Sequence, residues 1–192
     1  LRYTMDGSTP TVSSKVYERP LPVDQATVVK ARFFNRAGHG TATSEQSYKP
    51  VPPGSGFRYR IYKGKWTRMP DYRELTPIFE GVATDLNVES RQPSPDNWGI
   101  VLEGDFEIER PGDYTFYLKS DDGSKLYVDD KLVVDNDGDH SLLELKNATK
   151  LSAGTHKIRI EFFEASGEAV LELDVEGPGI KRQPLPIEKV SH

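Results

Sequence analysis

The amino-acid sequence predicts an all-β protein built from two antiparallel β-sandwich modules, a small one followed by a larger one. Apolar and polar residues alternate over strand-length stretches, and turn-forming pairs such as Asp122-Gly123 and Ser166-Gly167 recur between them. One stretch rich in proline and glycine interrupts the 192 residues and divides them unequally. The only segment with a helical pattern is short, at residues 71–75.

The dividing stretch covers residues 49–56 and reads Lys-Pro-Val-Pro-Pro-Gly-Ser-Gly. Proline cannot donate to a strand ladder and glycine weakens regular structure, so this composition is typical of a linker. We therefore predict a first module at residues 1–49, a linker at residues 50–56 and a second module at residues 57–192.

The first module shows the alternation of half-buried strands. Its inward parity is expected to carry two apolar runs: Leu1, Tyr3 and Met5, then Val29, Ala31 and Phe33. The alternation begins at the first residue, which suggests that the opening strand of the module is missing. A strand that lacks its neighbour leaves backbone groups unpaired. We therefore expect this module to be truncated at its N-terminus and less stable than the second.

Three stretches of this module, residues 3–11, Val16-Tyr17 and residues 29–33, resemble the C-terminal module of chitobiases and β-hexosaminidases. The resemblance implies a small Ig-like β-sandwich. It also implies an accessory module and not a catalytic domain.

The second module alternates more strongly, with charged residues on the opposite parity, which indicates antiparallel strands with one wet face. Its expected inward residues form three runs: Ile100, Leu102, Phe106 and Ile108; Ile158, Ile160 and Phe162; and Ala169, Leu171, Leu173 and Val175. Turn signals separate these runs at strand-length spacing, as expected for a sandwich.

Charge and hydropathy exclude two classes of partner. The net charge is -5 and no cluster of lysine and arginine marks a phosphate-binding surface, so we expect no nucleic acid. The apolar runs are far shorter than the ~20 residues that cross a bilayer, so we expect no membrane insertion. Cysteine is absent, which removes disulfides, thiolate nucleophiles and zinc-thiolate sites.

A long ordered motif lies in the second module. Residues 112–129 read GDYTFYLKSDDGSKLYVD and continue into KLVVDN at residues 131–136. Together with matching stretches upstream and downstream, this motif resembles the PA14 signature over about residues 56–188. PA14 domains are β-sandwiches appended to glycosidases, adhesins and toxins, so the resemblance implies a domain that binds glycans or polysaccharides.

The same resemblance implies a site. Several PA14 adhesins bind sugars through calcium held by two adjacent aspartates joined by a cis peptide bond, and Asp121-Asp122 match that pair. The adhesins also use an amide side chain after a later strand, where this chain has Glu164. Calcium takes about six to eight hard oxygen ligands, which carboxylates, backbone carbonyls and sugar hydroxyls supply. Asp121, Asp122 and Glu164 are therefore the expected calcium- and glycan-binding residues, and Glu164 departs from the pattern by adding charge.

Two other readings of the module stay open. Adjacent aspartates before a glycine commonly form a turn, with their side chains bonded to nearby backbone N–H groups and the glycine at positive φ. The two modules would then be a structural spacer or docking surface without a ligand. A fragment of an adhesin is a further alternative, although residues 62–66 look more like the enzyme-associated branch of PA14 domains.

Other candidate motifs point to structure. Residues 135–139 fail the EF-hand template, because position 6 is His140 and position 12 is Lys146, so we expect a polar loop near the sandwich end. Trp66 and Trp98 are expected in the core. The four histidines lack ligand-like spacing, and no nucleophile elbow, P-loop or dinucleotide fingerprint is present.

We therefore expect a non-catalytic accessory region of an exported bacterial glycoside hydrolase that resembles a β-N-acetylhexosaminidase. Its expected partners are a glycan and the catalytic domain of the same polypeptide. The expected location is periplasmic, outer-membrane-associated or extracellular.

Overall fold

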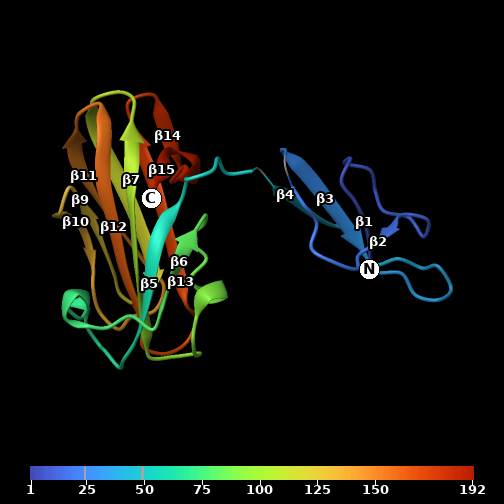
Figure 1. Cartoon of the computed structure of the whole chain (residues 1–192), viewed down its shortest axis with the longest axis horizontal. Helices are drawn as coiled ribbons and strands as arrows, with labels where there is room; N and C mark the ends of the chain where they lie inside the picture. The colour runs from blue at the N-terminus through green and yellow to red at the C-terminus, as the bar shows by residue number, and fades with distance from the viewer. Residues whose placement is uncertain (24, 49) are drawn as a thin grey trace. The chain divides into compact units, whose positions relative to one another are not determined.

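The computed structural model describes residues 1–23, 25–48 and 50–192, and it confirms an all-β chain with antiparallel sheets. The chain divides into two compact units, Leu1–Val51 and Pro52–His192 (Figure 1). This division falls inside the stretch that was predicted as a linker, while Lys49, the last residue of the predicted first module, lies outside the described residues. No helix in the described ranges is long and apolar enough to cross a membrane.

Unit 1 contains one four-stranded antiparallel sheet with the order β2-β1-β3-β4. Its strands are β1 (Arg2–Thr4), β2 (Lys15–Val16), β3 (Thr27–Arg32) and β4 (Ser44–Tyr48). Among the described residues of this unit, the Ig-like sandwich implied by the resemblance is represented by this one sheet. Pro10 is the one buried residue among those that the structure describes in this unit, so little apolar surface is removed from water here.

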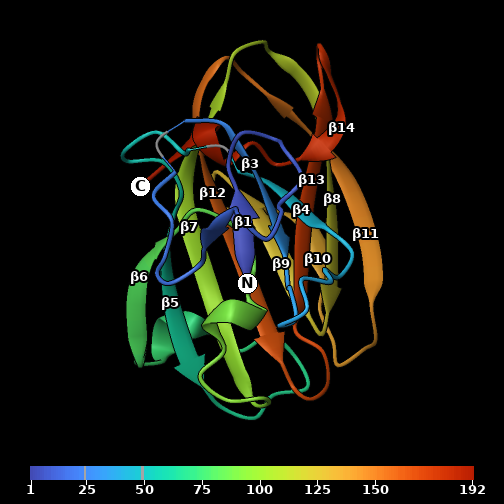
Figure 2. The same ribbon diagram turned by 90° about the vertical axis from the view of Figure 1, so that its right-hand side faces the viewer.

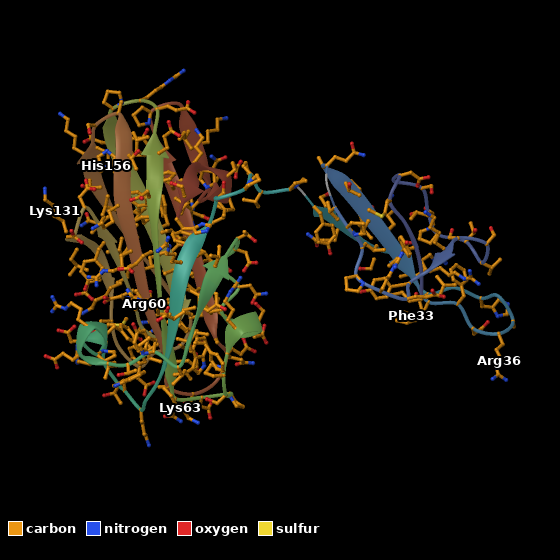
Figure 3. The ribbon with its side chains drawn as sticks, viewed as in Figure 1. Phe33, Arg36, Arg60, Lys63, Lys131 and His156 are labelled. Atoms are coloured by element: carbon orange, nitrogen blue, oxygen red, sulfur yellow. The ribbon has the colours of Figure 1, made fainter. Side chains whose placement is uncertain are left out.

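The inward parity predicted for unit 1 is not kept at Leu1, which precedes β1 and is 40% exposed, or at Phe33. Phe33 lies one residue beyond the end of β3 and is 61% exposed (Figure 3). The chain leaves the sheet at this point and forms an isolated bridge between Phe34 and Gly40. The alternation therefore outlasts the strand, and the expectation that Phe33 is half-buried was wrong.

Unit 2 is a two-layer sandwich. The larger sheet has the order β10-β9-β12-β7-β5-β6, with β15 also pairing with β7. Its strands are β5 (Phe57–Lys63), β6 (Phe79–Ala83), β7 (Trp98–Ile108), β9 (Ser124–Val128), β10 (Lys131–Asn136), β12 (Gly154–Glu164) and β15 (Val190–Ser191). The smaller sheet has the order β11-β8-β13-β14. It contains β8 (Gly112–Asp121), β11 (Leu143–Leu151), β13 (Val170–Gly177) and β14 (Ile180–Pro184).

The core of unit 2 lies between the two sheets (Figure 2). The predicted inward residues of β7, β12 and β13 are each 5% exposed or less, and Ala169 packs against them. Burial of each large apolar side chain stabilises the fold by about 1.5–3 kcal/mol. The predicted inward parity of these three strands is therefore confirmed. The expectation that the other face is wet was wrong for part of β7 and β12, because Val101 and Phe163 are also buried.

The segment between β5 and β6 packs over the outer face of the larger sheet. It contains a 3-10 turn, η1 (Tyr72–Glu74), where the sequence predicts a short helix. The Tyr72 hydroxyl donates to the Phe162 carbonyl at 2.6 Å, and a Cβ on Gly99 would lie 1.9 Å from that hydroxyl oxygen. Glycine is therefore required at position 99 for this segment to dock.

Both tryptophans pack against other side chains, and the acidic loop bonds to the segment between β5 and β6. Trp98 is fully buried, and Trp66 packs edge-on against Tyr72 with ring centroids 5.9 Å apart. The acidic stretch at residues 135–139 runs from the end of β10 into a loop, where the Asp137 carboxylate accepts from the Met69 backbone N–H at 2.6 Å. The other 3-10 turns are η2 (Glu89–Arg91) and η3 (Ile187–Lys189).

Candidate functional site

The ends of β8 and β12 meet at one end of the unit 2 sandwich. Strands β7 and β12 pair along their whole length, from Gly154 opposite Ile108 to Glu164 opposite Trp98. The Phe163 backbone N–H donates to the Gly123 carbonyl at 3.0 Å, which brings the turn after β8 beside the end of β12. Glu164, which lies 42 residues after Asp122 in the sequence, is thereby brought near the Asp121-Asp122 pair.

Figure 3 marks the two ends of this sandwich. Lys63 pairs with Trp98 and so lies at the end that holds Glu164, whereas His156 lies toward the opposite end. We call the group formed by Asp121, Asp122 and Glu164 the acidic site.

Asp122 ties two loops together with its side chain. It is 2% exposed, and its Oδ1 accepts from the His140 backbone N–H at 2.9 Å. Its Oδ2 accepts from the backbone N–H groups of Ala165 at 2.8 Å and Ser166 at 3.3 Å. The peptide bond between Asp121 and Asp122 is cis, the isomer that the resemblance implies. Both carboxylate oxygens of Asp122 therefore hold main-chain groups in place.

Glu164 is buried without compensation. Its side chain is fully buried, and neither carboxylate oxygen has a hydrogen-bond partner. Burial raises the pKa of Glu164 to about 8, and the nearby carboxylates of Asp122, Asp121 and Asp96 add to the rise. The Asp122 backbone N–H lies near enough to lower this pKa in part, but its geometry does not make a hydrogen bond. In the absence of a cation, this carboxyl holds a proton near neutral pH.

Asp121 is the more accessible carboxylate of the acidic site. It is partly exposed, at the last position of β8. Burial and the neighbouring Asp122 raise the pKa of Asp121, and the Leu142 backbone N–H and His140 lower it in part. Its oxygens are the ones best placed to meet a ligand from solvent.

His140 was missed by sequence reasoning. Its Nδ1 lies 2.9 Å from the Ser141 carbonyl and its Nε2 lies 3.1 Å from the Asn136 carbonyl. A carbonyl only accepts, so both ring nitrogens donate when both bonds are made, which requires the protonated ring. Burial lowers the pKa of His140, but the two carbonyls, Asp122 and Asp121 raise it more, so the net shift is upward. The two carbonyls and the neighbouring aspartates therefore favour the protonated form of His140 beside the acidic site.

Asp96 was also missed. Its Oδ1 accepts weakly from the Gly167 backbone N–H at 3.4 Å, and its charge contributes to the raised pKa of Glu164. Asp96 lies two residues before β7 and far from residues 121–122 in the sequence. No local motif connects these residues, and only strand pairing brings them close.

Gly123 has a different role from the one expected in a turn. It is not among the glycines of the described chain at positive φ, so that expectation was wrong. A Cβ at this position would lie 2.4 Å from Phe163 Cε1 and 2.8 Å from the Gly138 carbonyl oxygen. Glycine is needed here because the turn after β8, the end of β12 and the loop after β10 approach each other closely.

The donor set of the acidic site suits a hard cation. Carboxylate oxygens are the preferred ligands of calcium, and the two unpaired oxygens of Glu164 are available. The described residues contain no group of three histidine, aspartate or glutamate side chains already gathered around one point. Calcium held by Asp121 and Glu164 would therefore take its other ligands from backbone carbonyls, water or sugar hydroxyls.

A serine, histidine and aspartate meet at the opposite end of the sandwich. His156 Nδ1 lies 2.7 Å from Asp129 Oδ2, and its Nε2 lies 3.3 Å from Ser152 Oγ. Nε2 also lies 3.1 Å from the Ser152 carbonyl, to which it can only donate. A general base must accept the serine proton at Nε2. The arrangement is a hydrogen-bonded clamp on two turns.

The hairpin turn in this clamp also has the backbone of a tight primed turn. Asp129 and Asp130 have φ values of 50° and 61° between β9 and β10. Positive φ at both central positions is what a type I′ hairpin requires.

Comparisons with solved structures find this fold in several proteins. A PA14 sugar-binding domain from an RTX adhesin matches with a TM-score of 0.61 and 15% identity, over 72% of this chain and 98% of that one. An anti-sigma factor domain-containing protein from Clostridium clariflavum matches with a TM-score of 0.60 and 19% identity, over 85% of this chain and 60% of that one. The chain thus spans about 60% of the length of that protein. No curated protein sequence matches.

Family models match both units. The chitobiase/beta-hexosaminidase C-terminal domain matches residues 1–45. The PA14 domain matches residues 55–188, which is most of the chain and includes Asp121, Asp122 and Glu164. The order of the two matches is the order that the sequence predicts. The chain belongs to the PA14 domain family.

Proposed function

We propose that this chain is a non-catalytic, glycan-binding accessory region of an exported bacterial glycoside hydrolase of the β-N-acetylhexosaminidase type. The order of modules supports the proposal, because a hexosaminidase-associated module precedes a PA14 domain. One structural relative is itself described as a sugar-binding domain of an adhesin. Attachment of the parent enzyme to its polymer would raise the local concentration of substrate at the catalytic domain.

The proposed binding site is the acidic site, with calcium as the bridging ion. The observation that carries this proposal is the Glu164 carboxylate, which is fully buried and has no hydrogen-bond partner. A buried carboxyl without a partner must either stay protonated or carry a costly unpaired charge, and a divalent cation would let it ionise without that cost. Asp121 and Glu164 would ligate the ion, Asp122 would hold the surrounding loops, and sugar hydroxyls would complete the coordination.

A calcium titration by calorimetry, with metal-stripped protein, tests the site. We expect saturable binding at about 0.1–1 mM calcium, as in extracellular calcium modules. The Asp121→Ala, Asp122→Ala variant should lose it. The matched control is Asp129→Ala, Asp130→Ala, which removes an equivalent aspartate pair at the other end of the sandwich. Equal loss in both variants, or no binding by the folded wild type, would contradict a calcium site at Asp121-Asp122.

Glycan binding needs a separate test. An array of polysaccharides and oligosaccharides would be probed with calcium and again with a chelator. We expect binding that needs both calcium and Asp121. Hydrolysis of any of these glycans by the isolated chain would count against the non-catalytic role.

A structural spacer is the second candidate, and one observation favours it. Both oxygens of Asp122 accept backbone N–H groups, from His140 and from Ala165 and Ser166, as a purely loop-bracing residue would. The spacer reading predicts no calcium binding and no glycan binding, with loss of stability when Asp122 is removed. The calorimetric titration separates the two candidates.

A further inference from the structure

We infer that a buried side-chain network formed by Ser120, Ser124 and Asn136 positions the acidic site, with Asn136 as its central residue. The inference concerns residues outside the proposed ligand set. It rests on the proposed function only for its consequence on calcium affinity, because the positioning itself is a property of the protein without ligand.

The network lies in the interior of the sandwich, next to the acidic site in the sequence. Ser120 and Ser124 are fully buried, and Asn136 is 2% exposed. Ser120 immediately precedes the Asp121-Asp122 pair and Ser124 follows Gly123. Asn136 is the last residue of β10 and the register partner of Ser124.

The hydrogen bonds of the network join both sheets. The Ser120 and Ser124 hydroxyls lie 2.6 Å apart, which ties the end of β8 in the smaller sheet to the start of β9 in the larger one. The Asn136 amide donates to Ser120 Oγ at 2.9 Å and to the Leu143 carbonyl at 3.2 Å. One amide therefore braces β8 and the start of β11.

These bonds close a loop around Asp122. The chain between Asn136 and Leu143 contains His140, whose backbone N–H donates to Asp122 Oδ1. Asn136 stands at the start of this loop, and its amide bonds to the Leu143 carbonyl at the end of the loop. Its backbone carbonyl also lies 3.1 Å from His140 Nε2 in the middle of the loop. Without the amide, the loop keeps its contacts through Asp137, His140 and Asp122 but loses the bond that joins its two ends. The His140 N–H is then held less firmly against the Asp122 carboxylate.

The test compares Asn136→Ala with the control Asn147→Ala. Asn147 is a second asparagine whose amide donates to a backbone carbonyl, that of Val133 at 2.9 Å, but it lies in the middle of β11 away from the acidic site. Ser124→Ala is a milder variant that removes one hydroxyl and keeps the Cβ. Amide hydrogen exchange of His140 and Ala165, the donors to Asp122, is measured on calcium-free protein beside exchange in β7 and β12.

We expect Asn136→Ala and Ser124→Ala to speed exchange at His140 by about tenfold or more, with a smaller effect on central β7 amides. Asn147→Ala should leave His140 unchanged. Unchanged exchange at His140 in both network variants, or an equal rise in Asn147→Ala, would overturn the inference whether or not calcium binds.

Calcium affinity gives the second readout. If the wild type binds calcium, Asn136→Ala should weaken binding by about tenfold while Asn147→Ala does not. Wild-type affinity in a variant with faster His140 exchange would show that the network does not position the ligands. A wild type that binds no calcium would contradict the proposed function alone, and the exchange comparison would still decide the positioning.

Discussion

Glu164 and Trp98 are register partners in the last pair of the β7–β12 ladder, both are fully buried, and each carries polar atoms without a hydrogen-bond partner. The indole Nε1–H of Trp98 is an unpaired donor and the Glu164 carboxylate is an unpaired acceptor. Buried polar groups are normally paired. This end of the sandwich therefore holds buried polar atoms that the protein itself leaves unpaired, as a ligand site would.

Glu164→Gln should change the pH dependence of stability. The folded-state pKa of Glu164, about 8, lies above its ordinary value of 4.5, so the native state binds an extra proton between these two pH values. With calcium removed by a chelator, Glu164 therefore makes the free energy of unfolding of the wild type fall as pH rises from about 4.5 to 8, by at most about 1.4 kcal/mol per pH unit. Urea unfolding at pH 5, 6.5 and 8 measures this free energy. The variant should lose most of this slope, and equal slopes in both proteins would refute the assignment.

The two aspartates of the acidic site should differ in their effect on the free protein. Asp122→Ala removes an acceptor shared by three backbone N–H groups and should lower the free energy of unfolding by about 2–4 kcal/mol. Asp121→Ala, at a partly exposed position, should cost about 1 kcal/mol or less. Chemical denaturation in chelator compares them. A larger cost for Asp121→Ala would reverse the roles assigned here.

Asp129→Asn tests the clamp at the opposite end. Burial lowers the pKa of His156, but its hydrogen bond to Asp129 and the Ser152 carbonyl raise it by more, so the net pKa lies above 6.5. The clamp therefore stabilises the protein fully below pH 6.5, and this contribution is lost as pH rises through the folded-state pKa. The variant keeps an acceptor for the Lys157 N–H but not for His156. We expect a loss of about 1–2 kcal/mol at pH 6 and a smaller loss at pH 9, measured by urea unfolding. A pH-independent loss would show that His156 does not change its charge in this range.

The two units should differ in independent stability. A fragment of residues 52–192 retains the whole buried core of the sandwich and should unfold cooperatively with the calcium affinity of the full chain. A fragment of residues 1–51, in which Pro10 is the one buried residue among those described, should show no cooperative transition. Circular dichroism during heating checks both. A cooperative transition in the short fragment would show that its single sheet is sufficient.

The strands of unit 2 could be predicted because their signal is local. Successive side chains of a strand point to opposite faces, so alternation at residues 100–108 and 158–162 identifies the buried face without knowledge of the partner strands. The same rule misplaced Phe33, because alternation does not report where a strand ends. The Asp121-Asp122 pair and Glu164 were found through resemblance to a family pattern, and their proximity follows from the pairing of β12 with β7 and the contact of Phe163 with Gly123.

The amino-acid sequence by itself determined the all-β class, the inward parity of the long strands and the family to which residues 55–188 belong. Tertiary structure alone decided that the Glu164 carboxylate is buried without a partner and that His140 lies beside Asp122. It also decided that the Asn136 amide braces the loop that contains His140. The reason is that side-chain parity follows from the steric rules of each short stretch of backbone. Burial and charge environment depend on residues that lie far apart in the chain and meet only when the two sheets close.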